Sequence, residues 1–355
     1  SAKDELGDYQ GAIADYNKAI EINPQYADAY TNRGNAKSNL KDYQGAIADY
    51  NKALAINPQY ANAYNNRGVA KYDLKDYQGA IADYNKAIEL NPKLSKAYLN
   101  RGYARYNLGD YQGAIADFNK AIEINPQDAT AYTNRASAKN ELGDHKGAIS
   151  DSNKAIAINP KYADAYTNRG YAKSNLGDYQ GEIADYNKAI AINPQYARAY
   201  YNLGVAKDDL GDYQGAIADY NKAIAINPQY AAAYNNRGIV KKNLGDLEGA
   251  IADFNKAIEI NPQDATAYNN RGIAKGQLKD FQGAIVDFNR VIEINPQYAS
   301  AYIQRGIAKS NLGDYQGAIA DHSKAIEINP QYADAYTFRG YAKGLSGDQQ
   351  GMCLD

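Results

Sequence analysis

The ten prolines of this chain recur at a fixed interval. Each lies 34 residues after the previous one, from Pro24 to Pro330, and none falls outside the series. A strict period of this length is typical of repeat architectures, in which each repeat is one supersecondary unit stacked on its neighbours. The period therefore outweighs the two or three domains that 355 residues would otherwise suggest.

Repeat units that begin three residues after each proline account for every residue of the chain. Nine complete units cover residues 27–332, with a partial unit at 1–26 before them and another at 333–355 after them. No stretch is left over for a linker or a second domain. We therefore expect residues 1–355 to form a single solenoid.

Each unit reads as two helices joined by a tight turn. In the second half of the unit at 27–60, apolar residues follow Ala46 at helical spacing, Asp42 provides an N-cap before them, and Pro58 ends the helix. Lys41 and Asp42, replaced by Gly-Asp in most units, form the turn. Such a hairpin has too much apolar surface to bury alone, so neighbouring hairpins are predicted to stack.

The first half of the same unit is also helical and carries two stripes. The stripe predicted to face inward consists of Ala29, Arg33, Ala36 and Leu40, with Tyr30 and Gly34 on the same side. The stripe predicted to face outward consists of Asp28, Thr31, Asn32, Asn35 and Asn39. The outward stripe is the surface that a ligand would meet.

The unit resembles the tetratricopeptide repeat, which has the same length and much of the same pattern. The matching residues are Tyr30, Gly34, Ala46, Tyr50, Ala53 and Pro58. The resemblance implies an all-α, right-handed superhelical solenoid of antiparallel helical hairpins, with the first helices lining its concave face. It also implies a protein-interaction scaffold. Two departures are that a tyrosine replaces the usual tryptophan, and that an arginine replaces the usual leucine in nine of ten places.

These arginines fall on the inward stripe, where an unpaired charge would be costly. Asp49 lies on the inward face of the second helix, and an aspartate recurs at its place up to Asp355. We predict an Arg–Asp pair within or between hairpins, with Lys37 as a second donor. Where Leu203 replaces the arginine, we expect the nearby aspartates Asp219 or Asp185 to pair with Lys207 or Lys173.

Catalytic chemistry has little support in this chain. His145 and His322 are the two histidines, lie about five units apart and stand where other units have an aromatic residue, so we interpret both as packing aromatics. Cys353, the only cysteine, takes the place of an isoleucine and is interpreted as a core thiol. No catalytic, phosphate-binding or metal-ligand motif appears. We predict no enzyme activity, metal or cofactor.

The net charge of −2 gives no electrostatic reason to bind nucleic acid, and no apolar run reaches the roughly 18 residues needed to cross a bilayer. We therefore expect neither nucleic-acid binding nor membrane insertion. One cysteine leaves the compartment undecided.

An asparagine ladder runs along the predicted outward stripe. Its members, which form the candidate site, are Asn32, Asn66, Asn100, Asn134, Asn168, Asn202, Asn236 and Asn270. The ladder continues as Gln304 and breaks at Phe338. A carboxamide donates and accepts at once, so each could hold one peptide unit. First helices roughly 10 Å apart match three residues of extended chain at ~3.3 Å each.

The predicted groove is polar and nearly neutral, with seven acidic and three basic residues. This composition, and the resemblance to tetratricopeptide superhelices with such a ladder, favours a protein or extended peptide as partner. A purely structural role of the ladder between repeats stays open. The carboxylate clamp of the family is matched by Asn35, Asn66 and Lys96 but not by Thr31 and Asn100.

Two alternatives to a peptide-binding scaffold remain. Because both ends carry the internal pattern, as at Tyr9 and Tyr336, head-to-tail association into a filament is the first. Because both ends also fall within predicted helices, the second is that the chain is the substrate-recruiting region of a larger enzyme.

Overall fold

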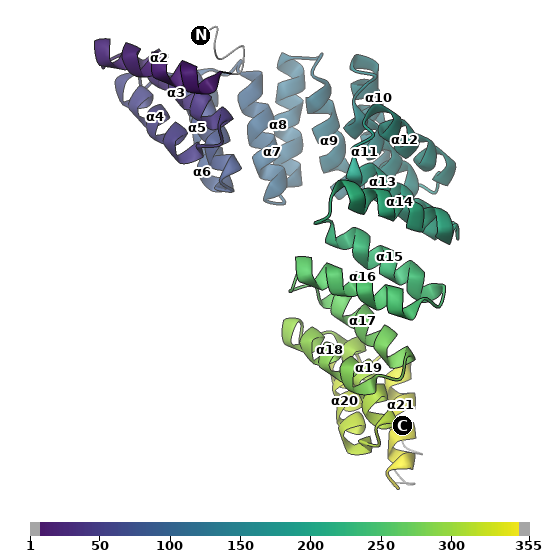
Figure 1. Ribbon diagram of the computed structural model, residues 1–355. Helices are drawn as coiled ribbons and strands as arrows, with labels where there is room; N and C mark the ends of the chain where they lie inside the picture. The colour runs from purple at the N-terminus through teal and green to yellow at the C-terminus, as the bar shows by residue number, and fades with distance from the viewer. Residues whose placement is uncertain (1–7, 348–355) are drawn as a thin grey trace. The chain divides into compact units, whose positions relative to one another are not determined.

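The computed structural model describes residues 8–347, and in this range the regular elements are twenty α-helices joined by short turns (Figure 1). The predicted all-α fold of stacked hairpins is confirmed. The first helices of the hairpins are α3 (Ala27–Asn39), α5 (Ala61–Asp73), α7 (Ser95–Asn107), α9 (Ala129–Glu141), α11 (Ala163–Asn175), α13 (Ala197–Asp209), α15 (Ala231–Asn243), α17 (Ala265–Gln277), α19 (Ala299–Asn311) and α21 (Ala333–Leu345). The second helices are α2 (Tyr9–Ile22), α4 (Tyr43–Ile56), α6 (Tyr77–Leu90), α8 (Tyr111–Ile124), α10 (His145–Ile158), α12 (Tyr179–Ile192), α14 (Tyr213–Ile226), α16 (Leu247–Ile260), α18 (Phe281–Ile294) and α20 (Tyr315–Ile328).

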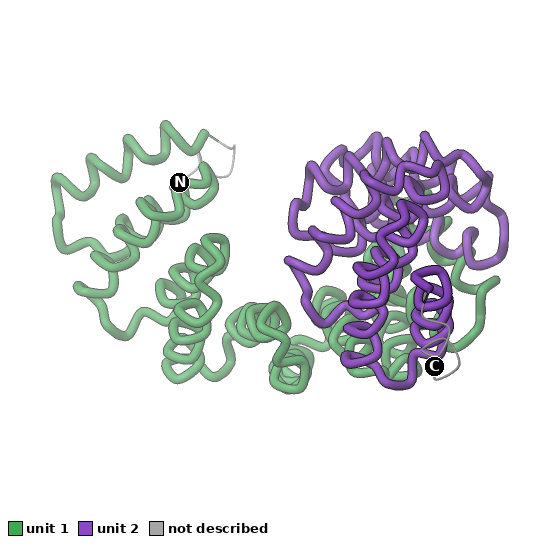
Figure 2. Tube along the Cα trace, turned by 90° about the horizontal axis from the view of Figure 1, so that it is seen from below, with its two compact units in different colours: residues 1–192 green, residues 193–355 purple. Residues whose placement is uncertain are grey.

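The chain divides into two compact units, residues 1–192 and residues 193–355 (Figure 2). Within each unit, every helix packs against its neighbours in sequence, and successive first helices also contact one another. Successive second helices show no comparable contact among the described residues. The first helices therefore lie on the inner side of each stack. A single solenoid over 1–355 stays a prediction.

The turn between the two helices follows from a short sequence signal. Asp42 caps α4 by accepting a hydrogen bond from the Gly45 amide at 2.9 Å. The residue before the cap has a left-handed backbone, with φ of 80° at Gly109 and 64° at Lys41. Glycine adopts this conformation without the steric cost that a Cβ brings, which explains why most hairpins use it here.

The core of a hairpin is built from small residues around one large ring. The Tyr50 ring is 1% exposed and lies against Gly34, where an added Cβ would approach the ring to 2.7 Å. One hairpin lacks this arrangement. Ala136 replaces the glycine there, and Ser152 replaces the aromatic residue. Both of these residues are fully buried. A glycine is therefore needed only where a ring packs against it.

Two assignments to the stripes of the first helix were wrong. Leu40, predicted inward, is 40% exposed because it follows the last turn of α3 and lies beside the turn that joins α3 to α4. Thr31, predicted outward, is 3% exposed, and its hydroxyl donates to the Ala27 carbonyl at 3.0 Å. Its face is covered because successive first helices contact each other.

Candidate functional site

Each buried aspartate is held by donors from the first helix of its own hairpin. Arg33 Nε and Nη2 donate to the two carboxylate oxygens of Asp49 at 2.9 and 2.6 Å, and Lys37 Nζ lies 2.8 Å from the same carboxylate. Asp49 is only 3% exposed. The hydrogen bond to Asp49 raises the pKa of Arg33. The predicted pair and its second donor are confirmed.

The pairing is repeated through both units. Equivalent bidentate pairs join Arg67 to Asp83, Arg101 to Asp117, Arg135 to Asp151, Arg169 to Asp185, Arg237 to Asp253, Arg271 to Asp287 and Arg305 to Asp321. Where Leu203 replaces the arginine, Lys207 Nζ lies 2.7 Å from Asp219, as predicted. Burial raises the pKa of Asp219 despite that lysine. Asp355 lies outside the described residues.

The arginine also reaches the preceding hairpin, which sequence reasoning missed. Arg33 Nη1 donates to Asn17 Oδ1 on α2 at 2.7 Å, and its guanidinium lies 5.4 Å from the centre of the Tyr30 ring. The sequence held a signal for this contact, because an asparagine recurs at the place of Asn17, for example as Asn51. The arginines therefore join hairpins and are occupied by protein partners.

The ladder asparagines lie on the first helices and bond to neighbouring hairpins. Four of these bonds run from Asn66 Nδ2 to Asn35 Oδ1 at 2.9 Å, from Asn100 Nδ2 to Asn65 Oδ1 at 3.1 Å, from Asn236 Nδ2 to the Tyr201 hydroxyl at 3.1 Å and from Asn270 Nδ2 to Asn235 Oδ1 at 3.1 Å. Asn168, which is 8% exposed, donates to the Thr133 carbonyl and the Ser137 hydroxyl. The ladder asparagines, each of which forms one rung, thus connect neighbouring hairpins.

Not every rung is engaged in this way. In the hairpin before Asn134, Leu99 stands at the position that Asn65 has in its own hairpin. Asn134 therefore meets no side-chain acceptor at that position. With the exception of Asn168, the rungs are half-buried rather than enclosed. Amide hydrogens and oxygen lone pairs in excess of the inter-hairpin bonds therefore remain along the first helices.

Two of the three residues that match a carboxylate clamp are hydrogen-bonded to each other. Asn35 Oδ1 accepts hydrogen bonds from Asn66 Nδ2 at 2.9 Å and from the Tyr50 hydroxyl at 2.8 Å. Lys96, which is exposed, is the one cation of the partial match. A single lysine lacks the cluster of cationic donors with which a carboxylate clamp holds its ligand.

Both histidines sit where a packing aromatic was predicted. His322 is 1% exposed, its ring lies against Gly306 as Tyr50 lies against Gly34, and burial lowers its pKa to about 4. His145 is half-buried and its ring meets Tyr171 edge-on at 6.4 Å. Cys353 lies outside the described residues.

Among residues 8–347 we find no group of three potential metal ligands. The helices in that range include none that is long and apolar enough to cross a membrane.

Comparison with known families identifies the repeat. The family model described as tetratricopeptide repeat matches residues 27–60, 61–94, 95–128, 197–230, 265–298 and 299–332. Related models of the repeat match residues 5–41, 136–177, 175–207, 241–279 and 219–252. The chain therefore belongs to the tetratricopeptide repeat family. A search of curated proteins found no match.

Solved structures share the fold. A chain of the APC/C hetero-tetramer Cut9-Hcn1 is 17% identical with a TM-score of 0.53, covering 99% of this chain and 77% of that one. PilF of Pseudomonas aeruginosa is 17% identical with a TM-score of 0.55, covering 60% and 97%. A tetratricopeptide repeat protein of Parabacteroides merdae is 22% identical with a TM-score of 0.50, covering 70% and 98%.

The repeats support a role as a protein-interaction scaffold. The described residues consist of repeat hairpins, and no catalytic domain is found among them.

Proposed function

We propose that the first helices bind extended polypeptide through the asparagine ladder. The observation that carries this proposal is a carboxamide at the same place of eight successive first helices, half-buried in seven of them. Each carboxamide offers two N–H donors and a carbonyl acceptor, which matches the backbone of an extended peptide without reading its side chains. The nearly neutral stripe around the ladder also suits an uncharged backbone.

The inter-hairpin bonds favour this function. Asn100 Nδ2 uses one of its two hydrogens on Asn65 Oδ1, and this bond fixes the orientation of the amide. An amide held in one orientation loses less freedom when a ligand binds, and such preorganisation improves affinity. The structural and ligand-binding roles of the ladder are therefore compatible.

The test separates the two roles of the ladder. The triple variant Asn66→Ala, Asn100→Ala and Asn134→Ala removes three rungs, whereas Asn65→Ala removes an inter-hairpin acceptor and keeps every rung. The probe is a fluorescently labelled pool of random-sequence peptides long enough to span several hairpins. At roughly 1 kcal/mol for each lost hydrogen bond, the triple variant should bind about 100-fold more weakly.

Helicity measured by circular dichroism must be unchanged in both variants, and Asn65→Ala should keep most of the affinity. Equal affinity of the triple variant and the wild type would rule out the ladder as the binding site.

Head-to-tail association is a second candidate, favoured by one exposed residue. Ile22 at the end of α2 is 77% exposed, whereas Ile56 at the same place of α4 is half-buried. Burying Ile22 against another copy would remove apolar surface from water. Sedimentation over a hundredfold concentration range tests this, and Ile22→Lys should abolish any association.

The role as a recruiting region of an enzyme stays a prediction that a full-length sequence would test.

A further inference from the structure

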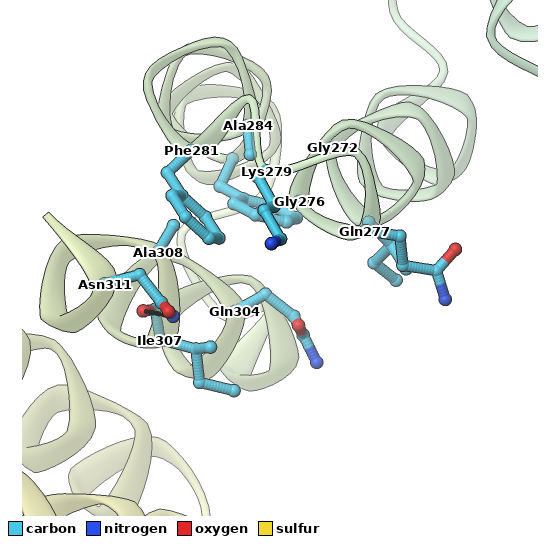
Figure 3. A pocket seen from close by; sticks show the side chains of 12 residues that line it. Gly272, Gly276, Gln277, Lys279, Phe281, Ala284, Gln304, Ile307, Ala308 and Asn311 are labelled. Atoms are coloured by element: carbon cyan, nitrogen blue, oxygen red, sulfur yellow. Dashed lines mark hydrogen bonds between the residues drawn. The ribbon is translucent and has the colours of Figure 1, made fainter. Parts of the chain in front are cut away.

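A cavity of about 460 Å³ opens between α17, α18 and α19, within the second compact unit (Figure 3). Its lining includes Gly276, Phe281, Phe288, Gln304, Ile307 and Asn311. This volume lies in the range of about 300 to 1,000 Å³ that is usual for ligand pockets. Gln304 continues the asparagine ladder, so the cavity adjoins the proposed path of the polypeptide.

The cavity exists because one hairpin lacks a side chain that others have. Gly276 occupies the place of Tyr72 in α5 and of Tyr106 in α7. A Cβ added to Gly276 would meet no atom within 4 Å, whereas one added to Gly272 would approach the Phe288 ring to 2.8 Å. A side chain at Gly276 would therefore extend into open space, whereas one at Gly272 would meet the Phe288 ring.

In α5, the chain itself shows which group this space accommodates. The Tyr72 ring packs against Tyr77 and Tyr103, with ring centres 5.2 and 5.4 Å apart. The Tyr72 hydroxyl accepts a hydrogen bond from Asn107 Nδ2 at 2.9 Å. Tyr106 repeats the ring contact in the next hairpin, where its ring centre lies 5.3 Å from that of Tyr111. A phenol thus fits this place in two hairpins.

The three neighbours of Tyr72 have counterparts around the cavity. In the register of the repeat, Tyr77 corresponds to Phe281, Tyr103 to Ile307 and Asn107 to Asn311. All three counterparts line the cavity, and Figure 3 shows their side chains around it. Apolar walls and one amide are therefore arranged around the cavity as they are around Tyr72.

The amide is also placed in the same way. Asn107 Nδ2 donates to the Tyr103 carbonyl at 2.8 Å and uses its second hydrogen for the Tyr72 hydroxyl. Asn311 Nδ2 makes the same bond to the Ile307 carbonyl at 2.8 Å. Because an amide nitrogen carries two hydrogens, the second one of Asn311 is directed as that of Asn107 is.

We propose that this cavity binds the side chain of a tyrosine from the bound polypeptide. The phenol ring packs between Phe281 and Ile307, and its hydroxyl accepts a hydrogen bond from Asn311 Nδ2. This inference rests on the proposed function, since the tyrosine belongs to a chain that lies along the first helices. It adds a sequence preference to a groove whose ladder recognises only backbone.

The first experiment tests the cavity without a peptide. The probe is p-cresol, the tyrosine side chain alone, and binding is followed by NMR shifts of the Phe281 and Ile307 signals. Gly276→Tyr fills the cavity as Tyr72 fills its own site and should abolish the shifts. Ser174→Tyr adds a tyrosine at the same place of α11 and should leave them unchanged. Absence of saturable shifts in the wild type, or equal shifts in Gly276→Tyr, would overturn the proposal.

The second experiment tests the preference with three peptides that differ only in carrying Tyr, Phe or Ala at one position. The wild type should prefer the tyrosine peptide to the phenylalanine peptide by about tenfold, the effect of one hydrogen bond. Asn311→Leu should remove that difference, and Gly276→Tyr should remove the preference for both rings over alanine. If Gly276→Tyr fully retained the tyrosine preference, the cavity would not be the tyrosine site, while peptide binding along the first helices would remain supported. If p-cresol binds but no peptide does, the proposed peptide binding along the first helices is rejected. The proposal that a polypeptide supplies the phenol is then rejected as well.

Discussion

A buried carboxylate stands at the centre of nearly every hairpin. Asp117 accepts two bonds from Arg101 and a third from Arg105 Nη1 at 2.9 Å, while it is only 2% exposed. The carboxylate offsets two cations at once, and the arginine extends the network to Asn85 on the preceding second helix. The charges are therefore interdependent.

Replacing Asp117 by alanine should lower stability by about 3 to 5 kcal/mol, because two partly buried cations lose their counterion. Glu123→Ala is the matched control, since its pair with Lys120 is exposed at the surface and should contribute little to stability. The urea midpoint of each variant measures the difference. Equal midpoints for the two variants would show that the Asp117 network contributes no more than a surface pair.

His322 makes the stability of its hairpin dependent on pH. Its pKa of about 4 in the folded chain lies below the ordinary value of about 6.5, chiefly because burial disfavours the charged ring. Between these values the unfolded chain binds the proton more readily, so stability falls as pH drops from about 6.5 to 4.

The expected loss is on the order of 2 kcal/mol relative to His322→Phe, which carries the ring found at Phe254 and Phe288 and cannot be protonated. Thermal midpoints of both proteins across this pH range provide the measurement. Parallel curves would show that the buried ring is not the titrating group.

At the level of the helix pair, glycine and the aromatic ring form a matched set. Ser152→Tyr alone should destabilise by about 1 to 3 kcal/mol, because the new ring would press against the Ala136 side chain. The double variant with Ala136→Gly recreates the arrangement of Gly34 and Tyr50 and should recover that loss. A double-mutant cycle of urea midpoints measures the coupling, and additive effects would argue against direct contact.

At the level of the whole molecule, the two compact units suggest separate folding. Each contains more than the roughly three repeats that stacked hairpins need to bury a core. Fragments 1–192 and 193–355 should therefore each show helical circular dichroism and a cooperative urea transition.

Asp253→Ala in fragment 193–355 serves as a control, because a natively folded fragment must lose stability when the Arg237 pair is broken. A fragment without a cooperative transition would contradict independent folding.

The sequence by itself determined the features that depend on neighbouring residues or on the period. The 34-residue spacing predicts the hairpins, Asp42 predicts the cap of α4, and the place of Arg33 on the inward stripe predicts a carboxylate partner such as Asp49. These follow because helix geometry sets which residues share a face and because a buried charge requires compensation.

Only the tertiary structure decided what happens where hairpins meet. Thr31 is buried and Asn17 is occupied by Arg33, because the adjacent hairpin covers one and reaches the other. The cavity beside Gly276 likewise depends on side chains from three helices, which no local pattern reveals. A position in a repeat can be exposed, lie in a contact between hairpins or line a cavity. Which of these it does depends on the side chains that pack against it, and these differ from one hairpin to the next.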